Sequence, residues 1–268
     1  MKGRSEEGIA LIAVLWSLVL LSIIAASVSW DARTSTRIAR NMADNAGVRA
    51  AADAGIQRAI LDLIGSAAQN EAGKFRADGT VYFWRFANCT VQISIQDELG
   101  KINLNQAPEA LFAALFGSVG VELGVAQSLA DAIADYRDSD NFARVRGAEE
   151  ANYRAAGLTW GPKNAPFQTL EELQRVLGIT AEIYRRVAPY LTIYSTAAIN
   201  PSLAGPRLTE ILRSAGFKDF VDSRGLAYSL RAEAKRFNGA VFIREAVVQI
   251  MPNGSIPILS WRQVAPKI

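Results

Sequence analysis

The stretch that decides the fold is IALIAVLWSLVLLSIIAASVSW, Ile9–Trp30, which contains no charged residue, no proline and no glycine. A helix of that length covers about 30 Å, the thickness of the hydrocarbon core of a bilayer. Secretory signal peptides have shorter apolar regions, of about 7–15 residues, although the small residues at 25–27 leave cleavage there as an alternative. We therefore expect residues 9–30 to be a transmembrane helix that follows a short polar segment, residues 1–8.

The helix should continue beyond the apolar stretch. The first proline of the chain is Pro108, and Ile56, Ile60 and Leu63 keep the spacing of a helix. We predict one helix from about residue 9 to residue 66, with its first half in lipid and its second half packed on a soluble domain. The alternative is a plain anchor followed by a separate helix. Basic residues both precede and follow the apolar stretch, so charge bias does not fix the membrane orientation.

Strands are expected in two groups that lie far apart in the sequence. Residues 81–86 and 90–96 form the first group, and residues 228–235, 241–251 and 258–263 form the second. Residues 90–96 alternate between apolar and polar side chains, the pattern of a half-buried strand. Asn238–Gly239 is a strong hairpin signal. Together the two groups predict an antiparallel sheet.

Between the two groups the chain has helical spacing at 107–116 and 121–137. Thr169 and Glu172 have the spacing of a capping box, which predicts a helix that ends at Gly178, and Thr180 should open the next helix. The sequence thus predicts an α+β fold in which an all-helical insert, residues 105–195, interrupts the sheet. Residues 31–104 supply the rest of the long helix and the first strands, and residues 196–268 supply a C-terminal helix and the last strands.

Composition argues against an enzyme. None of the 268 residues is histidine and Cys89 is the single cysteine, which removes Ser-His-Asp and Cys-His catalysis, histidine-based zinc sites and the commonest general base. Acid–base chemistry by Asp, Glu or Lys stays open. We expect Cys89 to be an apolar strand residue. A net charge of +3 with no dense basic run gives no reason to expect a nucleic-acid partner.

An acidic segment is the candidate metal site. Asp138, Asp140 and Glu149 have the spacing of positions 1, 3 and 12 of an EF-hand calcium loop. Phe142 and Ala143 stand at positions 5 and 6, where an EF-hand needs an oxygen ligand and a glycine. We therefore expect no EF-hand, and calcium held by several of these carboxylates is the hypothesis. The alternative is a helix that ends in a solvated acidic loop.

Residues 170–191 predict two helices joined by a Gly-Ile-Thr turn, similar to a helix-hairpin-helix unit that grips DNA phosphates. Glu171, Glu172 and Glu182 flank the turn, whereas phosphate binding needs positive charge. We favour a structural helical pair, with a membrane-anchored DNA-binding protein as the lesser alternative.

Several segments in this order resemble the general secretion pathway protein K (GspK) family, minor pseudopilins of type II secretion systems. Gly8 followed by IALIAVLW looks like a prepilin cleavage junction. The other segments are DELGKINLN (97–105), ADYRDSD, GAEEANY, GPKNAPFQTLEELQRVLGIT, VAPYLTIYS, FIREAVVQI and PILSWRQ. Two positions depart from related patterns. Ala13 stands where pilins usually carry Glu, although this family typically does not, and INPSLAG (199–205) stands where the family often reads closer to Asn-x-Asn-Thr-Ala.

The resemblance implies a pilin-like fold, methylation, and cleavage between Gly8 and Ile9 by a prepilin peptidase. It implies a single-pass inner-membrane protein with its body in the periplasm, in contact with membrane lipid. The partners would be other minor pseudopilins, in a complex at the tip of a pseudopilus that this subunit helps to initiate for export across the outer membrane. Calcium would be held by the acidic residues of the insert. The closest alternative is a minor subunit of a related type IV pilus.

Overall fold

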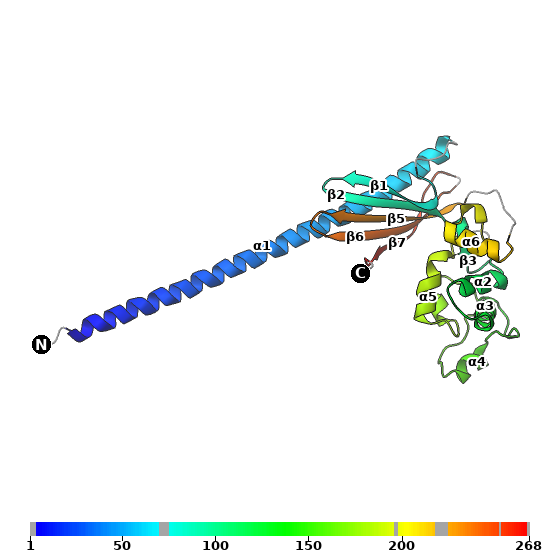
Figure 1. Ribbon diagram of the computed structural model, residues 1–268, viewed down its shortest axis with the longest axis horizontal. Helices are drawn as coiled ribbons and strands as arrows, with labels where there is room; N and C mark the ends of the chain where they lie inside the picture. The colour runs from blue at the N-terminus through cyan, green and yellow to red at the C-terminus, as the bar shows by residue number, and fades with distance from the viewer. Residues whose placement is uncertain (1–3, 70–74, 196–197, 218–224, 252, 267–268) are drawn as a thin grey trace.

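In this computed structural model the described residues are 4–69, 75–195, 198–217, 225–251 and 253–266; the side chains of residues 4–10 and 66–69 are not described. One continuous helix, α1 (Arg4–Gln69), runs through the molecule and leaves the body as a long shaft (Figure 1). This confirms the prediction of a single helix. Its apolar part is long and apolar enough to cross a membrane, and none of that part is buried against the rest of the chain.

A face of small side chains packs the second half of α1 on the sheet. Val48, Ala51, Ala52, Ile56 and Ala59 are buried there, at the three- and four-residue spacing of one helical face. Gly55 lies among them. A Cβ atom added at Gly55 would lie 2.9 Å from Ala232 Cβ and 2.9 Å from Val91 Cγ1. The helix therefore approaches the sheet closely because it lacks a side chain at this point.

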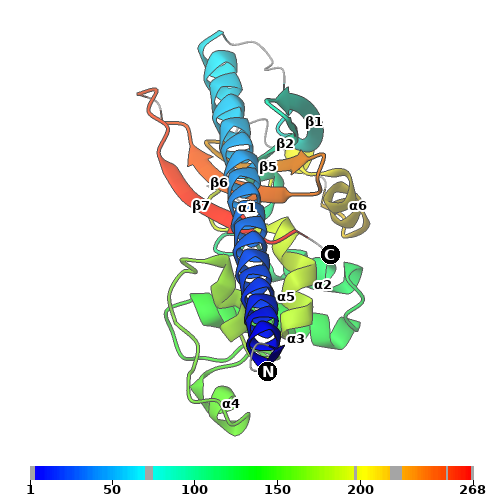
Figure 2. The same cartoon turned by 90° about the vertical axis from the view of Figure 1, so that its left-hand side faces the viewer.

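The sheet has five antiparallel strands in the order β1-β2-β5-β6-β7. They are β1 (Asp78–Phe86), β2 (Cys89–Asp97), β5 (Ala227–Arg236), β6 (Val241–Gln249) and β7 (Ile258–Val264). The alternation predicted for residues 90–96 is present: Val91, Ile93 and Ile95 are buried in the core shared with α1. Cys89 is buried in β2, as predicted. Figure 2 shows α1 crossing one face of the sheet.

The insert leaves the sheet at the end of β2 and returns at β5, so it connects two strands that are neighbours. Its elements are η1 (Glu98–Gly100), β3 (Ile102–Asn103), α2 (Glu109–Ser118), α3 (Leu123–Arg137), α4 (Glu150–Ala155), η2 (Leu170–Arg175), α5 (Ala181–Val187), η3 (Ala188–Tyr190), β4 (Leu191–Thr192), η4 (Pro201–Leu203) and α6 (Pro206–Ser214). A short parallel pair, β3 with β4, joins its two ends. Within the described residues, the regular secondary structure of the insert is thus helical except for this pair.

A second hydrophobic core belongs to the insert. Its largest buried side chains include Phe112, Phe116, Ile133 and Tyr153. This core has no buried residue in common with the core under α1. Helix α6 contributes Leu208, Ile211 and Leu212 to this second core. The helix expected in residues 196–268 therefore packs with the insert rather than on the sheet.

The predicted capping box is wrong in detail. Residues 170–175 form the 3₁₀ helix η2, which ends before Gly178, and the side chain of Thr169 makes no capping hydrogen bond. The Glu172 carboxylate accepts from the backbone N–H of Gln168 at 3.2 Å and pairs with Lys163 at 2.8 Å. The carboxylate thus bonds to the N–H of the residue before Thr169 and not to the N–H of Thr169 itself.

We expect Gly55→Ala to destabilise the protein and Gly65→Ala to stabilise it. Alanine favours a helix over glycine by up to about 1 kcal/mol, but at Gly55 the added methyl overlaps Ala232 and Val91. Overpacking of this kind costs about 1–3 kcal/mol. Nothing lies within 4 Å of a Cβ at Gly65, which makes it the matched control. Denaturant unfolding of the full chain in detergent measures both; equal stability gains would contradict the close packing.

Candidate functional site

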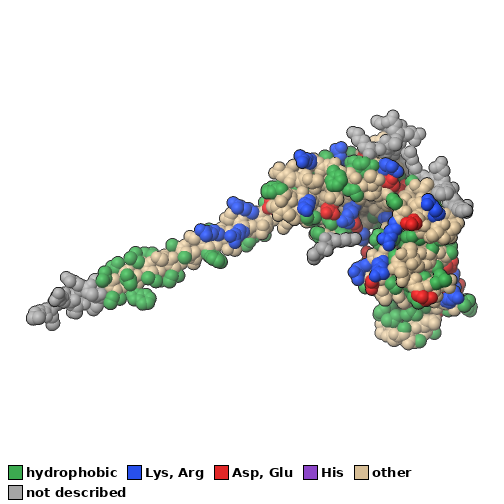
Figure 3. All heavy atoms as spheres, in the orientation of Figure 1, with side chains coloured by type: hydrophobic (Ala, Val, Ile, Leu, Met, Phe, Trp, Pro, Cys, Tyr) green, Lys and Arg blue, Asp and Glu red, His purple; other side chains and the backbone are tan. Residues whose placement is uncertain are grey.

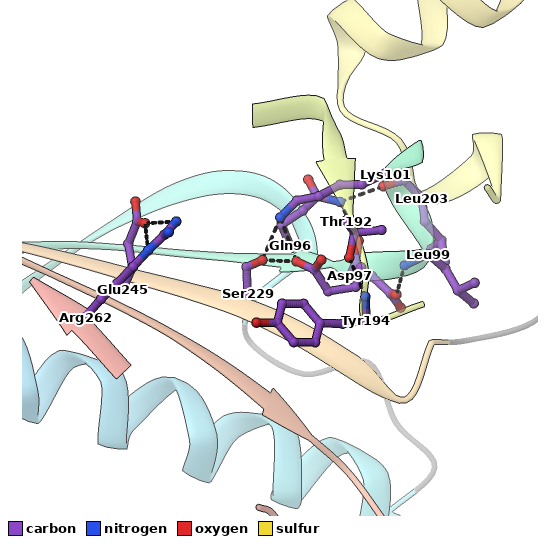
Figure 4. A network of polar contacts seen from close by, with 11 residues as sticks. Gln96, Asp97, Leu99, Lys101, Thr192, Tyr194, Leu203, Ser229, Glu245 and Arg262 are labelled. Atoms are coloured by element: carbon purple, nitrogen blue, oxygen red, sulfur yellow. Dashed lines mark hydrogen bonds and ion pairs between the residues drawn. The ribbon is translucent and has the colours of Figure 1, made fainter. Parts of the chain in front are cut away.

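The joint between sheet and insert is a buried polar network at the end of β2 (Figure 4). Asp97 is 2% exposed. Its Oδ1 accepts a hydrogen bond from the Leu99 N–H at 2.9 Å, and its Oδ2 accepts one from the Gly225 N–H at 2.9 Å. One carboxylate thus caps η1 and holds the segment that leads into β5. Burial raises the pKa of Asp97, although its two backbone hydrogen bonds lower it in part.

Glu98, Lys101 and Ser229 form the second half of the joint. Lys101 Nζ lies 2.6 Å from Glu98 Oε1 and 2.7 Å from Ser229 Oγ, and the Ser229 hydroxyl also donates to Glu98 Oε1. Glu98 is 2% exposed, so its charge needs this partner. A Cβ atom at Gly100 would lie 2.1 Å from the Leu203 carbonyl oxygen, which shows how closely η1 and η4 approach each other.

The candidate metal residues come together at the far end of the insert. Asp138 follows the last residue of α3 and Glu149 precedes the first residue of α4. One carboxylate oxygen from each of Asp138, Asp140 and Glu149 lies within 4.8 Å of the other two. Calcium binds oxygen at 2.3–2.6 Å, so two oxygens on one ion lie at most about 5 Å apart. The three carboxylates, which are close in the sequence, therefore also lie close enough in space to bind one calcium ion.

Glu149 is the most buried member of this group. It is 6% exposed, yet neither of its carboxylate oxygens has a hydrogen-bond partner among the described residues, and Asp138 Oδ1 also has none. Burial raises the pKa of Glu149, and the charges of Asp135, Asp138 and Asp140 raise it further. Buried acceptors without partners are uncommon in folded proteins. The donor set therefore fits a cation with oxygen ligands.

Asp135 and Arg144 hold the acidic loop in shape. Asp135 is fully buried and accepts from Arg144 Nη1 at 2.7 Å and from the Ala148 N–H at 2.8 Å. The same Arg144 nitrogen pairs with Asp138 Oδ2, which leaves Asp138 Oδ1 turned elsewhere. A Cβ at Gly147 would lie 1.8 Å from Asp135 Oδ2, so a glycine is needed there for the loop to close over Asp135.

Spacing alone did not reveal these two residues as a pair. Asp135 lies three residues before Asp138, but its partner Arg144 lies nine residues on and faces it only because the loop folds back. Asn164 was also missed: it donates from its Nδ2 to Asn141 and from its backbone N–H to Tyr136, while its own Oδ1 is buried without a partner. The Pro-flanked segment around Asn164 carried no signal for this placement.

The helix-hairpin-helix turn has little to offer a phosphate. The N–H of Leu177 donates to the Tyr153 hydroxyl at 3.0 Å and the N–H of Ile179 donates to the Val176 carbonyl at 3.1 Å. Both amides are therefore used inside the insert. Gly178 has φ of +85°, and a Cβ there would lie 2.8 Å from Leu129 Cδ2. The glycine serves the packing of the turn.

The processing residues lie at the start of α1. Gly8 and Ile9 are helical in their backbone, and their side chains fall outside the described residues. Ala13 is exposed on the shaft. Cleavage at Gly8 stays a prediction.

Comparison with known proteins finds a family model that matches the insert. Residues 94–196 match the model of "Type II secretion system (T2SS), protein K". Type II secretion system protein K of Pectobacterium carotovorum is 27% identical over 71% of this chain and 63% of its own length, and that of Klebsiella pneumoniae is 27% identical over 70% of this chain and 63% of its own length. The chain spans less than two-thirds of the length of such relatives.

Among solved structures, a chain of the GspK-GspI-GspJ complex from enterotoxigenic Escherichia coli has a similar fold. The TM-score is 0.59 at 14% sequence identity, with 86% of this chain and 99% of that chain covered. At that identity the likeness concerns the fold. It confirms the pilin-like α+β architecture that the sequence predicted.

The buried Asp97 predicts a pH-dependent difference between the protein and Asp97→Asn. Because the folded-state pKa is raised above its ordinary value of 3.8, the folded protein binds a proton more tightly than the unfolded chain does. The stability from this group is present below that value and is lost as pH rises through the folded pKa. The stability deficit of Asp97→Asn should therefore shrink as pH rises above about 4. Denaturant unfolding across pH measures it, and a deficit that grows with pH would contradict the raised pKa.

Proposed function

We propose that this chain is a member of the type II secretion system protein K family and acts as a minor pseudopilin at the tip of a pseudopilus, because residues 94–196 match that family's model and relatives of that name are 27% identical. It is anchored in the inner membrane by residues 9–30, with its body in the periplasm. It helps to initiate pseudopilus assembly and export across the outer membrane. Its role is structural rather than catalytic, in keeping with the absence of histidine from the sequence.

The observation that carries this proposal is the continuity of α1. The helix passes without a break from an exposed apolar segment to a face of small residues packed on the sheet. Subunits of that shape can pack the apolar halves of their helices side by side. Each helix then holds its own body at a fixed distance from the apolar segment. A separate anchor and a flexible linker would not transmit position in this way.

Partners of the same class are proposed from the complex in which the similar fold occurs, which contains GspI and GspJ. The test is co-purification of the full chain, in detergent, with the corresponding minor pseudopilins of its own organism. A stable complex of stated stoichiometry supports a tip assembly. A chain that co-purifies instead with subunits of a type IV pilus would support that alternative.

Calcium is proposed as the ion of the acidic loop, with Asp138, Asp140 and Glu149 as ligands. The ion would supply charge to three carboxylates that otherwise repel one another, and it would satisfy the buried oxygens of Glu149. Calcium takes 6–8 oxygen ligands, so water or backbone oxygens complete the set. The prime support is the buried, unpartnered Glu149 carboxylate.

Calcium should raise the melting temperature of the full chain, and Asp138→Ala/Asp140→Ala should abolish that rise. A ligand that binds only the folded state adds about 2.7 kcal/mol at 100 times its dissociation constant. The matched control is Glu182→Ala/Glu210→Ala, which removes two exposed carboxylates elsewhere in the described chain. Differential scanning calorimetry with calcium or chelator is the measurement. Equal melting temperatures in both conditions would remove these residues from the metal site.

Processing should occur between Gly8 and Ile9. A prepilin peptidase acting on the cytoplasmic side would leave the apolar helix intact, so the mature chain should begin at Ile9. N-terminal sequencing of the membrane-extracted protein tests this, and Gly8→Phe should block the cleavage. A mature chain that begins near Val28 would show that an ordinary signal peptidase removes the helix, and the anchor would be lost.

Ala13 should be tolerated because of the position of the subunit. In pilin-like assembly a carboxylate at the fifth mature residue is thought to pair with the N-terminal amine of the subunit ahead, and a buried charge without a partner is costly. Ala13 has no carboxylate, and a tip subunit has no neighbour ahead of it. Ala13→Glu should therefore leave tip assembly largely intact. Immunogold labelling should find the subunit at filament ends; labelling repeated along the shaft would contradict this placement.

A further inference from the structure

Three arginines follow the apolar part of α1 and precede the sheet. Arg33, Arg37 and Arg40 are spaced by four and three residues, so they lie on one side of the helix, and all three are exposed. We call them the arginine stripe. Figure 3 shows blue basic side chains gathered on the shaft between its apolar end and the body.

The end of the sheet lies next to this stripe, on the side of the body. Asp44 lies four residues beyond Arg40, on the same side of α1. Its carboxylate accepts from Arg236 Nη1 at 2.6 Å and from Asn238 Nδ2, both at the turn between β5 and β6. The stripe and this turn therefore face the same direction. The turn between β1 and β2, residues 87–88, lies at the same end of the sheet (Figure 1).

This end of the sheet is basic and carries an exposed aromatic ring. Arg85, Lys235 and Arg236 line an open hollow of about 720 Å³, and none of its lining residues is acidic. Arg85 pairs with Thr90 across the strands and Thr90 pairs with Lys235, so the two cations share one face of the sheet. Phe237 is 90% exposed at the turn. We call residues 85–90 and 235–239 the hairpin tip.

The distance from the membrane follows from the rise of the helix. If Trp30 ends the apolar span, Arg33 lies about 4.5 Å beyond it, Arg37 about 10 Å and Arg40 about 15 Å. The headgroup layer of one leaflet is about 5–7 Å thick. Arg33 therefore lies within the headgroups, and Arg37 can snorkel towards them. The hairpin tip is level with Asp44, about 21 Å beyond Trp30 along the helix. A tilt of α1 towards the stripe brings the tip closer to the headgroups.

We propose that the arginine stripe and the hairpin tip bind the anionic phospholipid headgroups of the leaflet from which the body emerges, with α1 tilted towards the stripe. Transmembrane helices tilt by about 20° on average, and interfacial anchors set the direction. Basic residues close to an anionic surface are attracted to it within a Debye length. Phe237 adds an apolar side chain at the interface. This inference rests on the proposed membrane anchor.

An acidic partner protein is the other class of molecule that such a basic surface could bind. The depth of Arg33 argues against it, because a folded partner domain does not enter the headgroup layer. The side chains of the stripe also begin where the apolar residues end, which ties them to the bilayer.

The test places a fluorophore on Asn88→Cys, in a Cys89→Ala background, of the full chain in nanodiscs. Energy transfer to a headgroup-labelled lipid reports the height of the hairpin tip. We expect more transfer in phosphatidylcholine with phosphatidylglycerol than in phosphatidylcholine alone. The difference should shrink as the Debye length falls from about 10 Å at 0.1 M salt to about 3 Å at 1 M.

Arg33→Gln/Arg37→Gln/Arg40→Gln should lose the response to anionic lipid. The matched control, Arg185→Gln/Arg207→Gln/Arg213→Gln, removes the same charge from exposed positions on the insert side and should keep it. Equal transfer in the two lipids, or a response kept by the stripe variant, overturns the inference. So does a stripe variant that keeps the lipid response but no longer co-purifies with neighbouring pseudopilins, since the stripe would then bind protein.

A chain that does not enter the nanodisc overturns the proposed membrane anchor as well. A chain that enters it but shows equal energy transfer in the two lipids overturns this inference alone.

Discussion

The rest of the structure depends on the close contact between α1 and strands β2 and β5. Small residues on one face of α1 let the helix backbone come within van der Waals distance of Val91 and Ala232. Larger side chains would lift the helix away and expose the apolar face of the sheet. Because the same helix continues into the apolar shaft, this contact sets the position of the body relative to the anchor. Burial of both faces supplies the driving force.

Ion pairs at this contact fix its register more than they add stability. Arg244 is 5% exposed, lies 2.6 Å from Asp53 Oδ1 and stacks between the rings of Phe242 and Trp261. Arg236 reaches Asp44 in the same way, nine residues earlier on the helix. Buried ion pairs gain little net free energy over apolar residues, but breaking one is costly. A shift of α1 by one residue would break both pairs at once, so they select a single alignment of helix and sheet.

Periodic patterns in the sequence were enough to predict the helices and strands that bury one continuous face. The apolar run predicted the shaft, and the alternation of residues 90–96 predicted which side of β2 meets α1. Contacts between segments that lie far apart in the sequence could not be predicted from it. Asp97 meets Gly225 and Glu98 meets Ser229, residues more than a hundred positions away that carry no local pattern. Glu172 does not form the predicted capping box; its carboxylate pairs instead with Lys163 and accepts from the Gln168 N–H, neither of which the capping pattern includes. The proximity of Asp138, Asp140 and Glu149 was predictable because their spacing is local, whereas the Asp135–Arg144 pair that shapes their loop was not.

The acidic loop differs from the rest of the insert in what holds it. Its large apolar side chains face solvent, with Phe142 84% exposed and Val145 fully exposed, so hydrophobic burial contributes little there. Helix α4 has six residues, too short to be stable alone in water. Order in this part of the chain therefore comes from the polar contacts of Asp135 with Arg144 and the Ala148 N–H, together with the burial of Tyr153 of α4 in the insert core. These contacts leave Asp138, Asp140 and Glu149 facing one another with a net negative charge. The calcium proposed for this site would neutralise that charge and would stabilise a loop that gains little from apolar burial.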